Sequence, residues 1–411
     1  MKCLWLTLAD PDPPENGQYL YSSGLIHAVA SAGLDLHVVG LTRPGASHFS
    51  GERADRVTWR LANHRPCSQW IALASTLPQL AVRTRTREMQ RSIGELLERD
   101  QWDVVLFDSI AIGWALPAVL RHARSAARPP RLVYLSHNHE ENVAHRIARD
   151  EVNFFKRQVR LLDALKVARL ERALVRNADV MTSNSPEDCE QFGSAWPSKP
   201  VRFLPPGYRQ PHLAERHITS EIPRRAIIVG SFEWFPKRLS LENFLRVADP
   251  LFAKAGVELH VVGNAREAYL DQMRGTVAAT TFTGYVDDVR PHMAQARLAL
   301  VPDHLGGFKL KALDYVFNRL PILAISGSVP GMPLRHAESI LLHADHEALA
   351  HGVLRIIDDF DALNRMQDFA YLACRDQFDW SAIGRRLISA ISLVDDLRRS
   401  NHAAAPLPTA I

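Results

Sequence analysis

A glycine loop followed by two lysines carries the clearest chemical signal in this 411-residue chain. Its sequence is Gly306-Gly307-Phe308-Lys309-Leu310-Lys311, and a helical pattern containing Asp314 follows. Backbone N–H groups at a helix N-terminus bind anions, and glycines let a phosphate approach the backbone. Lysines at a helix N-terminus oppose the helix dipole, so an anionic ligand there would stabilise them. The carboxylate of Asp314 would accept hydrogen bonds from a ribose. Alternatively, Lys311 and Asp314 pair with each other on a solvated helix.

Two further groups are candidates for catalysis or metal binding. His137 follows the apolar run Leu132–Leu135, at the strand end where ligands bind in α/β sheets. The alternative is a loop or capping histidine, since the chain has 18 histidines. Asp10-Pro11-Asp12 has a metal-binding D-x-D form, but its proline-rich surroundings favour a turn.

Alternating apolar strands and helices must position these groups. This pattern predicts parallel sheets with right-handed crossovers, in an α/β fold of two doubly wound Rossmann-like domains with a ligand cleft between them. The break at Leu204-Pro205-Pro206-Gly207 gives domains 1–205 and 206–379, followed by a packing helix and tail, 380–411. One long helix is expected from about Val143 to Asn177.

Composition limits the class of protein. The net charge is +4, with 46% apolar and 23% charged residues, which excludes disordered and disulfide-scaffold classes and leaves no nucleic-acid footprint. The four cysteines form no metal-ligand spacing, and neither a signal peptide nor an apolar span is evident. We therefore expect a cytoplasmic protein without a metal.

Two basic stretches suggest a partner. One contains Arg83, Arg85, Arg87 and Arg91, and the other is the expected long helix. Either would bind an anionic membrane face or a lipid-diphosphate acceptor. A solvated face with intrahelical pairs is the favoured interpretation of the long helix, and for Arg83–Arg91 both interpretations stay open. Peripheral contact with the inner membrane face therefore remains an expectation.

The segment Gly307–Asp314 resembles the nucleotide-sugar signature of family-4 glycosyltransferases, which have the GT-B fold. Other stretches resemble that family in the same order along residues 4–325. They are Pro13–Gly17, Ser136–Glu140, Ala178–Ser185, Ile228–Pro236 and Thr283–Val289.

The resemblance implies a hexosyltransferase-like, metal-independent enzyme that moves a sugar from a nucleoside-diphosphate sugar to a hydroxyl acceptor with retention. That acceptor would be a glycan, a lipid-linked intermediate or a small molecule, as in polysaccharide biosynthesis. No cofactor is implied besides the sugar-nucleotide substrate. His137 would face the reacting sugar as the catalytic residue. The implied donor-binding residues are Gly17, Gly230, Lys237, Gly284, Val286, Gly307, Phe308, Lys309, Lys311 and Asp314.

Three positions depart from the family pattern. Gly306 stands where many members have a sugar-binding Glu, Asp314 replaces a Glu, and Lys237 replaces an Asn. Two alternatives therefore remain: a nucleotide-sugar epimerase of the same fold, and a catalytically degenerate partner subunit.

Overall fold

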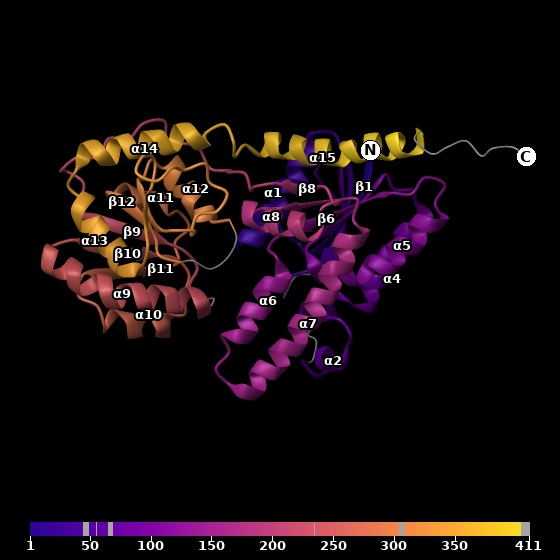
Figure 1. Ribbon diagram of the computed structural model, residues 1–411, viewed down its shortest axis with the longest axis horizontal. Coiled ribbons are helices and arrows are strands. Elements are labelled where there is room, and N and C mark those ends of the chain that lie inside the picture. Colours follow the sequence, from indigo (N-terminus) through magenta and orange to yellow (C-terminus); the bar gives the residue numbers. More distant parts are fainter. Residues whose placement is uncertain (44–48, 55, 65–68, 234, 304–307, 404–411) are drawn as a thin grey trace, which may run out of the picture. The chain divides into compact units, whose positions relative to one another are not determined.

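The computed structural model describes residues 1–43, 49–54, 56–64, 69–233, 235–303 and 308–403. The chain forms two compact units (Figure 1). Unit 1 combines Met1–Gly207 with Trp380–Ile411, and unit 2 is Tyr208–Asp379. Within the described residues, no helix has the length and apolar character needed to cross a bilayer.

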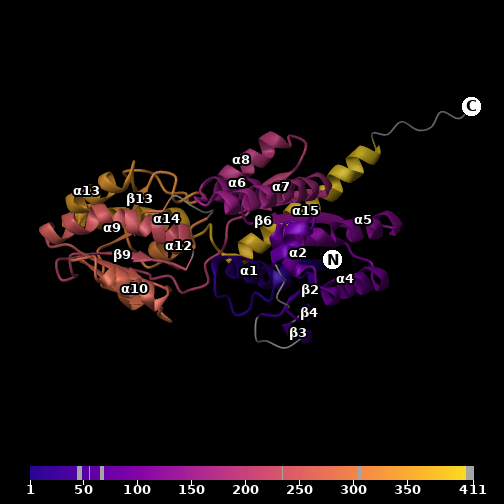
Figure 2. The same ribbon diagram turned by 90° about the horizontal axis from the view of Figure 1, so that it is seen from below.

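Unit 1 is built on an eight-stranded sheet with the order β3-β4-β2-β1-β5-β6-β7-β8. Its strands are β1 (Lys2–Ala9), β2 (Asp35–Leu41), β3 (Phe49–Ala54), β4 (Val57–Ala62), β5 (Val104–Asp108), β6 (Arg131–Ser136), β7 (Val180–Ser183) and β8 (Val201–Phe203). The pairs from β4 to β8 are parallel, as predicted. The edge strand β3, which lies beside β4 in Figure 2, departs from this prediction because it pairs antiparallel with β4. Only two residues separate β3 from β4, and a connection this short joins antiparallel strands, whereas parallel strands need a long crossover.

The helices of unit 1 connect these strands. They are α1 (Gly17–Ser31), α2 (Gln69–Ala74), α3 (Gln79–Thr84), α4 (Arg87–Arg99), the 3₁₀ helix η1 (Ile110–Ala115), α5 (Leu116–Ser125), α6 (Glu140–Arg149), α7 (Phe154–Asn177), α8 (Pro186–Ala195) and α15 (Trp380–Ala403).

The single long helix expected from Val143 to Asn177 is wrong, because α6 and α7 are separate helices. Asn153 starts the second one, since its side chain accepts a hydrogen bond from the Lys156 N–H at 3.0 Å. Asparagine is among the strongest N-cap residues, so this position favours a new helix start over continuation of the first helix.

Helix α15 packs on α1 within unit 1. Three of its side chains are fully buried in the apolar core on one face of the sheet of unit 1: Ile383, Leu387 and Ile391. Gly384 on α15 allows the two helices to approach closely. A Cβ at this position would lie 2.8 Å from the Ala28 backbone, which is too close for a side chain. Segment 380–411 was expected as a packing helix and tail after the second domain, and its helix completes the core of unit 1.

Unit 2 has a six-stranded parallel sheet with the order β11-β10-β9-β12-β13-β14. Its strands are β9 (Arg225–Val229), β10 (Glu258–Val262), β11 (Thr280–Gly284), β12 (Leu298–Val301), β13 (Ile322–Ile325) and β14 (Leu341–His343). Its helices are α9 (Phe235–Ala255), α10 (Glu267–Arg274), α11 (Arg290–Ala294), α12 (Leu310–Phe317), α13 (His346–Ile356) and α14 (Phe360–Cys374). The strand order reverses between β9 and β12, which is the point where ligands bind in open α/β sheets.

Candidate functional site

At the point of unit 2 where the strand order reverses, the segments that follow β9 and β12 bring glycine and charged residues together. Gly230 and Lys237 follow β9, while Asp303, Lys309 and Lys311 follow β12. Because parallel strands end at the same edge of a sheet, the two connections meet there. Lys237, Asp303 and Lys311 line one small cavity of 20 Å³. The sequence therefore brings three lysines and one carboxylate to one place.

Asp303 is the centre of this lysine cluster. Its carboxylate lies 2.9 Å from the Lys309 Nζ and 2.5 Å from the Lys311 Nζ. Burial opposes ionisation of Asp303, but Lys311 and Lys309 outweigh it and hold the pKa of Asp303 well below its usual range. The carboxylate is therefore ionised, and it partly satisfies the two lysines that the sequence placed against the helix dipole.

The cluster keeps an excess of positive charge. Burial and the charge of Lys311 lower the pKa of Lys237 to about 8, against the opposing charge of Asp303. Burial also lowers the pKa of Lys309, against the charge of Asp303. Three lysines thus face one carboxylate. Lys309, the N-cap residue of α12, makes no side-chain capping hydrogen bond to that helix. Lysines beside a helix N-terminus that Lys309 does not cap form an arrangement suited to an anion such as a diphosphate.

Asp314 is separate from the lysines. A hydrogen bond joins it to the Tyr208 hydroxyl, and burial raises the pKa of Asp314 to about 7 although that hydrogen bond lowers it. The alternative pairing of Lys311 with Asp314 is wrong, because Lys311 pairs with Asp303. Asp314 lies on α12, in the same unit as the lysine cluster.

The remaining predicted residues of unit 2 border the same strand ends or α12. Gly284 ends β11 with a φ of 79°, a left-handed conformation that glycine adopts without strain. Val286 and Phe308 pack against the same apolar core, and Phe308 contacts Phe378 with ring centroids 5.6 Å apart. The predictions at Gly306 and Gly307 lie outside the described residues.

In unit 1, His137 lies directly after β6 and is only 7% exposed. Its Nε2 is 2.6 Å from the carboxylate of Asp108, the last residue of β5. The other oxygen of Asp108 accepts a hydrogen bond from the Trp5 indole at 3.0 Å. Burial opposes ionisation of Asp108, but hydrogen bonds from His137, Trp5 and Ser22 outweigh it and lower its pKa.

An ionised carboxylate only accepts hydrogen bonds, so the Nε2 atom of His137 donates to Asp108. The Nδ1 atom has no hydrogen-bond partner among the described residues. The imidazole is also held by the Tyr21 ring, whose centroid is 5.3 Å away in an edge-to-face contact. The Asp108–His137 pair therefore has the geometry that an oriented general base or acid requires.

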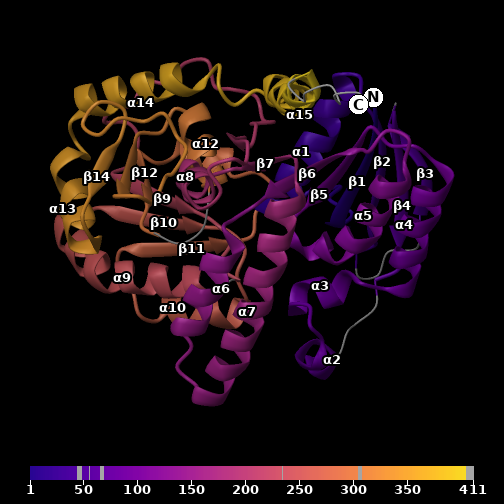
Figure 3. The same cartoon turned by 45° about the vertical axis from the view of Figure 1, so that its right-hand side comes forward.

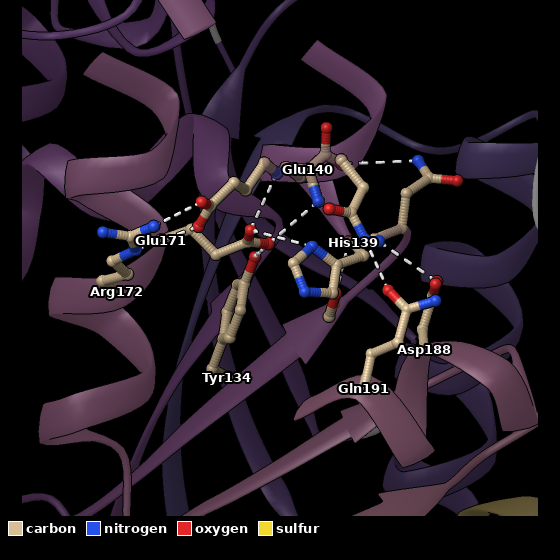
Figure 4. Close-up of polar contacts among 11 residues, drawn as sticks. Tyr134, His139, Glu140, Glu171, Arg172, Asp188 and Gln191 are labelled. Atoms are coloured by element: carbon tan, nitrogen blue, oxygen red, sulfur yellow. Dashed lines mark hydrogen bonds and ion pairs between the residues drawn. The ribbon is translucent and has the colours of Figure 1, made fainter. Parts of the chain in front are cut away.

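The side chains of the neighbouring residues His139 and Glu140 contact different groups (Figure 4). The His139 ring stacks on Phe192 with centroids 4.4 Å apart. The Glu140 side chain accepts a hydrogen bond from Asn138 at 3.3 Å. His139 therefore packs against unit 1's core.

Glu171 of α7 anchors this segment, although the sequence did not identify it. Its carboxylate accepts hydrogen bonds from the N–H groups of Glu140 and Glu141, the first residues of α6, at 3.0 and 2.9 Å, and one from Tyr134 (Figure 4). It is 1% exposed, and burial raises the pKa of Glu171 to about 8 although the two N–H groups lower it. Glu171 thus fixes the start of α6, three residues after His137.

The free energy of unfolding is expected to fall by roughly 3 kcal/mol between pH 5 and pH 8 through Glu171 alone. Its folded pKa lies above the unfolded one, so the folded state holds the extra proton at low pH and loses this advantage as pH rises. Urea denaturation of the wild type and of Glu171→Gln at several pH values would isolate the contribution. Parallel pH profiles of the two proteins would contradict it.

The first loop of unit 1 contains the D-x-D segment and Gly17. The Asp12 carboxylate accepts a hydrogen bond from Ser23 at 2.5 Å and lies 2.9 Å from His27, both on α1. Gly17 begins α1, after Asn16 caps the helix through the Tyr19 N–H. Across the described residues, no group of three or more His, Cys, Asp or Glu side chains is arranged to hold a metal ion.

Comparison with known proteins confirms the predicted fold. Residues 223–359 match the family model of glycosyl transferases group 1. A sucrose-phosphate synthase from Thermosynechococcus elongatus superposes with a TM-score of 0.69 at 17% identity, over 98% of this chain and 100% of that one. WaaG, a glycosyltransferase involved in lipopolysaccharide biosynthesis, gives 0.61 at 15% identity, over 95% and 99%.

Anabaena HepE in complex with UDP and glucose also gives 0.61 at 15% identity, over 95% of this chain and 99% of that one. No curated protein sequence matches the chain. The chain has the α/β GT-B architecture of two Rossmann-like domains and resembles the glycosyltransferases of that fold, as its motifs predicted.

Proposed function

We propose that this chain is a glycosyltransferase that moves a sugar from a nucleoside-diphosphate sugar to a hydroxyl of a glycan, a lipid-linked intermediate or a small molecule, with retention of configuration. The lysine cluster at the reversal point of unit 2 carries the proposal, because it brings three lysines and one carboxylate together where α12 begins. The match of residues 223–359 to glycosyl transferases group 1 supports it.

Each part of the donor would meet a different group of unit 2. Lys237, Lys309 and Lys311 would bind the diphosphate, and they would exchange part of their pairing with Asp303 for the phosphate oxygens. Asp314 would accept a hydrogen bond from the ribose. Because burial raises its pKa to about 7, that interaction would strengthen as pH rises through neutrality, when the carboxylate becomes ionised. The residues 284–286 would contact the base.

His137 would act on the sugar-transfer step. With Asp108 holding the proton on Nε2, the Nδ1 lone pair can accept a hydrogen bond from a sugar or acceptor hydroxyl. In a retaining transfer without a protein nucleophile, the diphosphate leaves while the acceptor attacks from the same face. The enzyme would then contribute orientation and charge stabilisation at the leaving group.

A two-stage assay tests this function. The first stage measures thermal stabilisation by uridine, guanosine and adenosine diphosphates and by their sugar conjugates. The second stage incubates the stabilising sugar nucleotide and follows hydrolysis, transfer to simple glycosides and epimerisation by NMR. Slow hydrolysis or transfer with a retained anomer supports the proposal. Epimerisation without release of the diphosphate would identify an epimerase, and absence of both binding and turnover would identify a degenerate partner subunit.

Turnover is expected to survive chelation of divalent metals. The lysines and the N-terminus of α12 can offset charge that develops on the leaving diphosphate, which other enzymes offset with Mg²⁺. The measurement compares the rate of donor hydrolysis or transfer before and after EDTA treatment, with Mg²⁺ and Mn²⁺ added back separately. Loss of turnover with EDTA and recovery with either metal would contradict the prediction and make Asp10 and Asp12 the first residues to replace.

A further inference from the structure

The connection between α6 and α7 exposes a concentration of apolar side chains. Val152 is 97% exposed, Phe154 65% and Phe155 79%. The two phenylalanine rings contact each other, with centroids 5.7 Å apart in an edge-to-face arrangement. Single exposed apolar residues are ordinary, but adjacent exposed aromatics at the end of a projecting element mark an interaction surface.

This surface belongs to a helix that extends beyond the core. Every residue from 152 to 160 is exposed, and the first buried residue of α7 is Ala164. The hairpin end projects from the sheet of unit 1 (Figures 1 and 3). We call residues 152–160 the α6–α7 tip. The tip makes little contribution to the core, so core packing does not explain its apolar side chains.

The tip and the helical segments beside it are strongly basic. Residues 143–169 contain seven basic and three acidic side chains, an excess of four positive charges, which equals the formal net charge of the whole chain. Lys156 and Arg157 follow the two phenylalanines directly and are exposed. Arg160 is engaged in an ion pair with Glu151 at 2.8 Å. Basic side chains beside exposed aromatics complement a surface that is anionic outside and apolar beneath.

An apolar groove continues from the tip along α7. It encloses a cavity of 710 Å³ between α6, α7 and the α2–α3 segment, and its lining includes Leu73, Ile147, Phe155 and Val159 together with Lys156 and Arg160. The contact of α7 with α2 is fixed by Lys166, whose ammonium donates to the carbonyl groups of Ala72 and Leu73, each at 3.0 Å. On α2, Ile71 is 59% exposed and adds an apolar group near the groove.

We propose that the α6–α7 tip docks unit 1 on the surface of an anionic lipid bilayer. Val152, Phe154 and Phe155 enter the boundary between headgroups and acyl chains, while Lys156 and Arg157 contact lipid phosphates. The combination of projecting aromatics with a local excess of positive charge selects a bilayer as the occupant. This inference goes beyond the proposed transferase activity and does not depend on it, since binding to a bilayer requires neither donor nor acceptor.

Sedimentation with vesicles tests the proposal on the full chain. The wild type is expected to bind vesicles of phosphatidylcholine mixed with phosphatidylglycerol, to release with added salt, and to bind pure phosphatidylcholine much more weakly. Phe154→Ser with Phe155→Ser should lower the partition coefficient by about tenfold or more. Lys156→Glu with Arg157→Glu should lower it by at least about tenfold on anionic vesicles.

A control changes two apolar residues of unit 2 that are also exposed. Phe369 and Leu372 on α14 are 45% and 53% exposed, and their double replacement by serine should leave vesicle binding unchanged. Thermal unfolding should show that every variant remains folded, because all the altered side chains are exposed.

Three outcomes would overturn the proposal. The first is wild-type vesicle binding by both tip variants, and the second is equal binding of the wild type to neutral and anionic vesicles. The third is a wild type that does not bind vesicles but self-associates, with the self-association lost in the double variant Phe154→Ser with Phe155→Ser. That result would assign the surface to a second copy of the chain.

Discussion

Replacing His137 with alanine is expected to lower the turnover number by about 100-fold or more, which is the usual contribution of a positioned general acid or base. The imidazole is oriented by Asp108 at 2.6 Å and packed against Tyr21, so its loss removes an aligned group. The affinity for a nucleoside diphosphate should change little, since the lysine cluster lies in unit 2. Steady-state kinetics and calorimetric titration separate these effects.

A matched control is His145→Ala, which removes an exposed histidine from α6 and should leave turnover unchanged. Asp108→Asn provides a second comparison, because it keeps the shape of the side chain but removes the charge that orients His137. Its pH profile of turnover should differ from that of the wild type, as expected of a positioning residue. Wild-type turnover in His137→Ala would exclude His137 from the site.

Replacing Lys311 with alanine is expected to raise the dissociation constant of a nucleoside diphosphate by about 10- to 100-fold, the effect of losing one strong charge-assisted hydrogen bond. Affinity for the corresponding nucleoside should fall much less, because Lys311 belongs to the phosphate-binding part of the proposed site. Asp303 would still be paired with Lys309 at 2.9 Å, so the carboxylate is not left without a cation. Calorimetric titration with both ligands measures the difference.

Lys254→Ala is the control for general loss of charge, since Lys254 is an exposed lysine in the last turn of α9. It should leave both affinities unchanged. An equal weakening of nucleoside and nucleoside-diphosphate binding by Lys311→Ala would mean that Lys311 supports the local fold through Asp303. It would then have no direct part in binding phosphate.

Buried strands were the most predictable part of the fold. The strands β10, β12 and β13 coincide with runs of mostly apolar residues in the sequence. Strands that are covered on both faces are continuous apolar runs, so the sequence marks them directly. The polar strand Phe49–Ala54 has no such run and was not predicted. The division of the expected long helix depended on one capping residue, Asn153, inside a segment with helical periodicity.

Site residues that act through a partner were harder to predict. His137 was proposed as a site residue from its place after a strand, but its partner Asp108 is 29 residues earlier and reaches it only because β5 and β6 pair side by side. Asp303 gave a weak signal, since it precedes Lys309 and Lys311 by six and eight residues across a loop. Glu171 gave none, because its role depends on where α7 packs against the start of α6. Tertiary contacts, which a single sequence does not encode locally, decide these pairs.

The return of α15 to unit 1 has a consequence for folding during synthesis. Unit 2 is an uninterrupted segment, Tyr208–Asp379, inserted into unit 1. The ribosome therefore completes unit 2 before it releases Ile383, Leu387 and Ile391, which fill the core of unit 1. Although unit 1 begins at the N-terminus, its core must remain incomplete until the last helix emerges. This reverses the usual order in which N-terminal domains fold first, because an apolar face of unit 1 stays uncovered until Ile383, Leu387 and Ile391 have been synthesised.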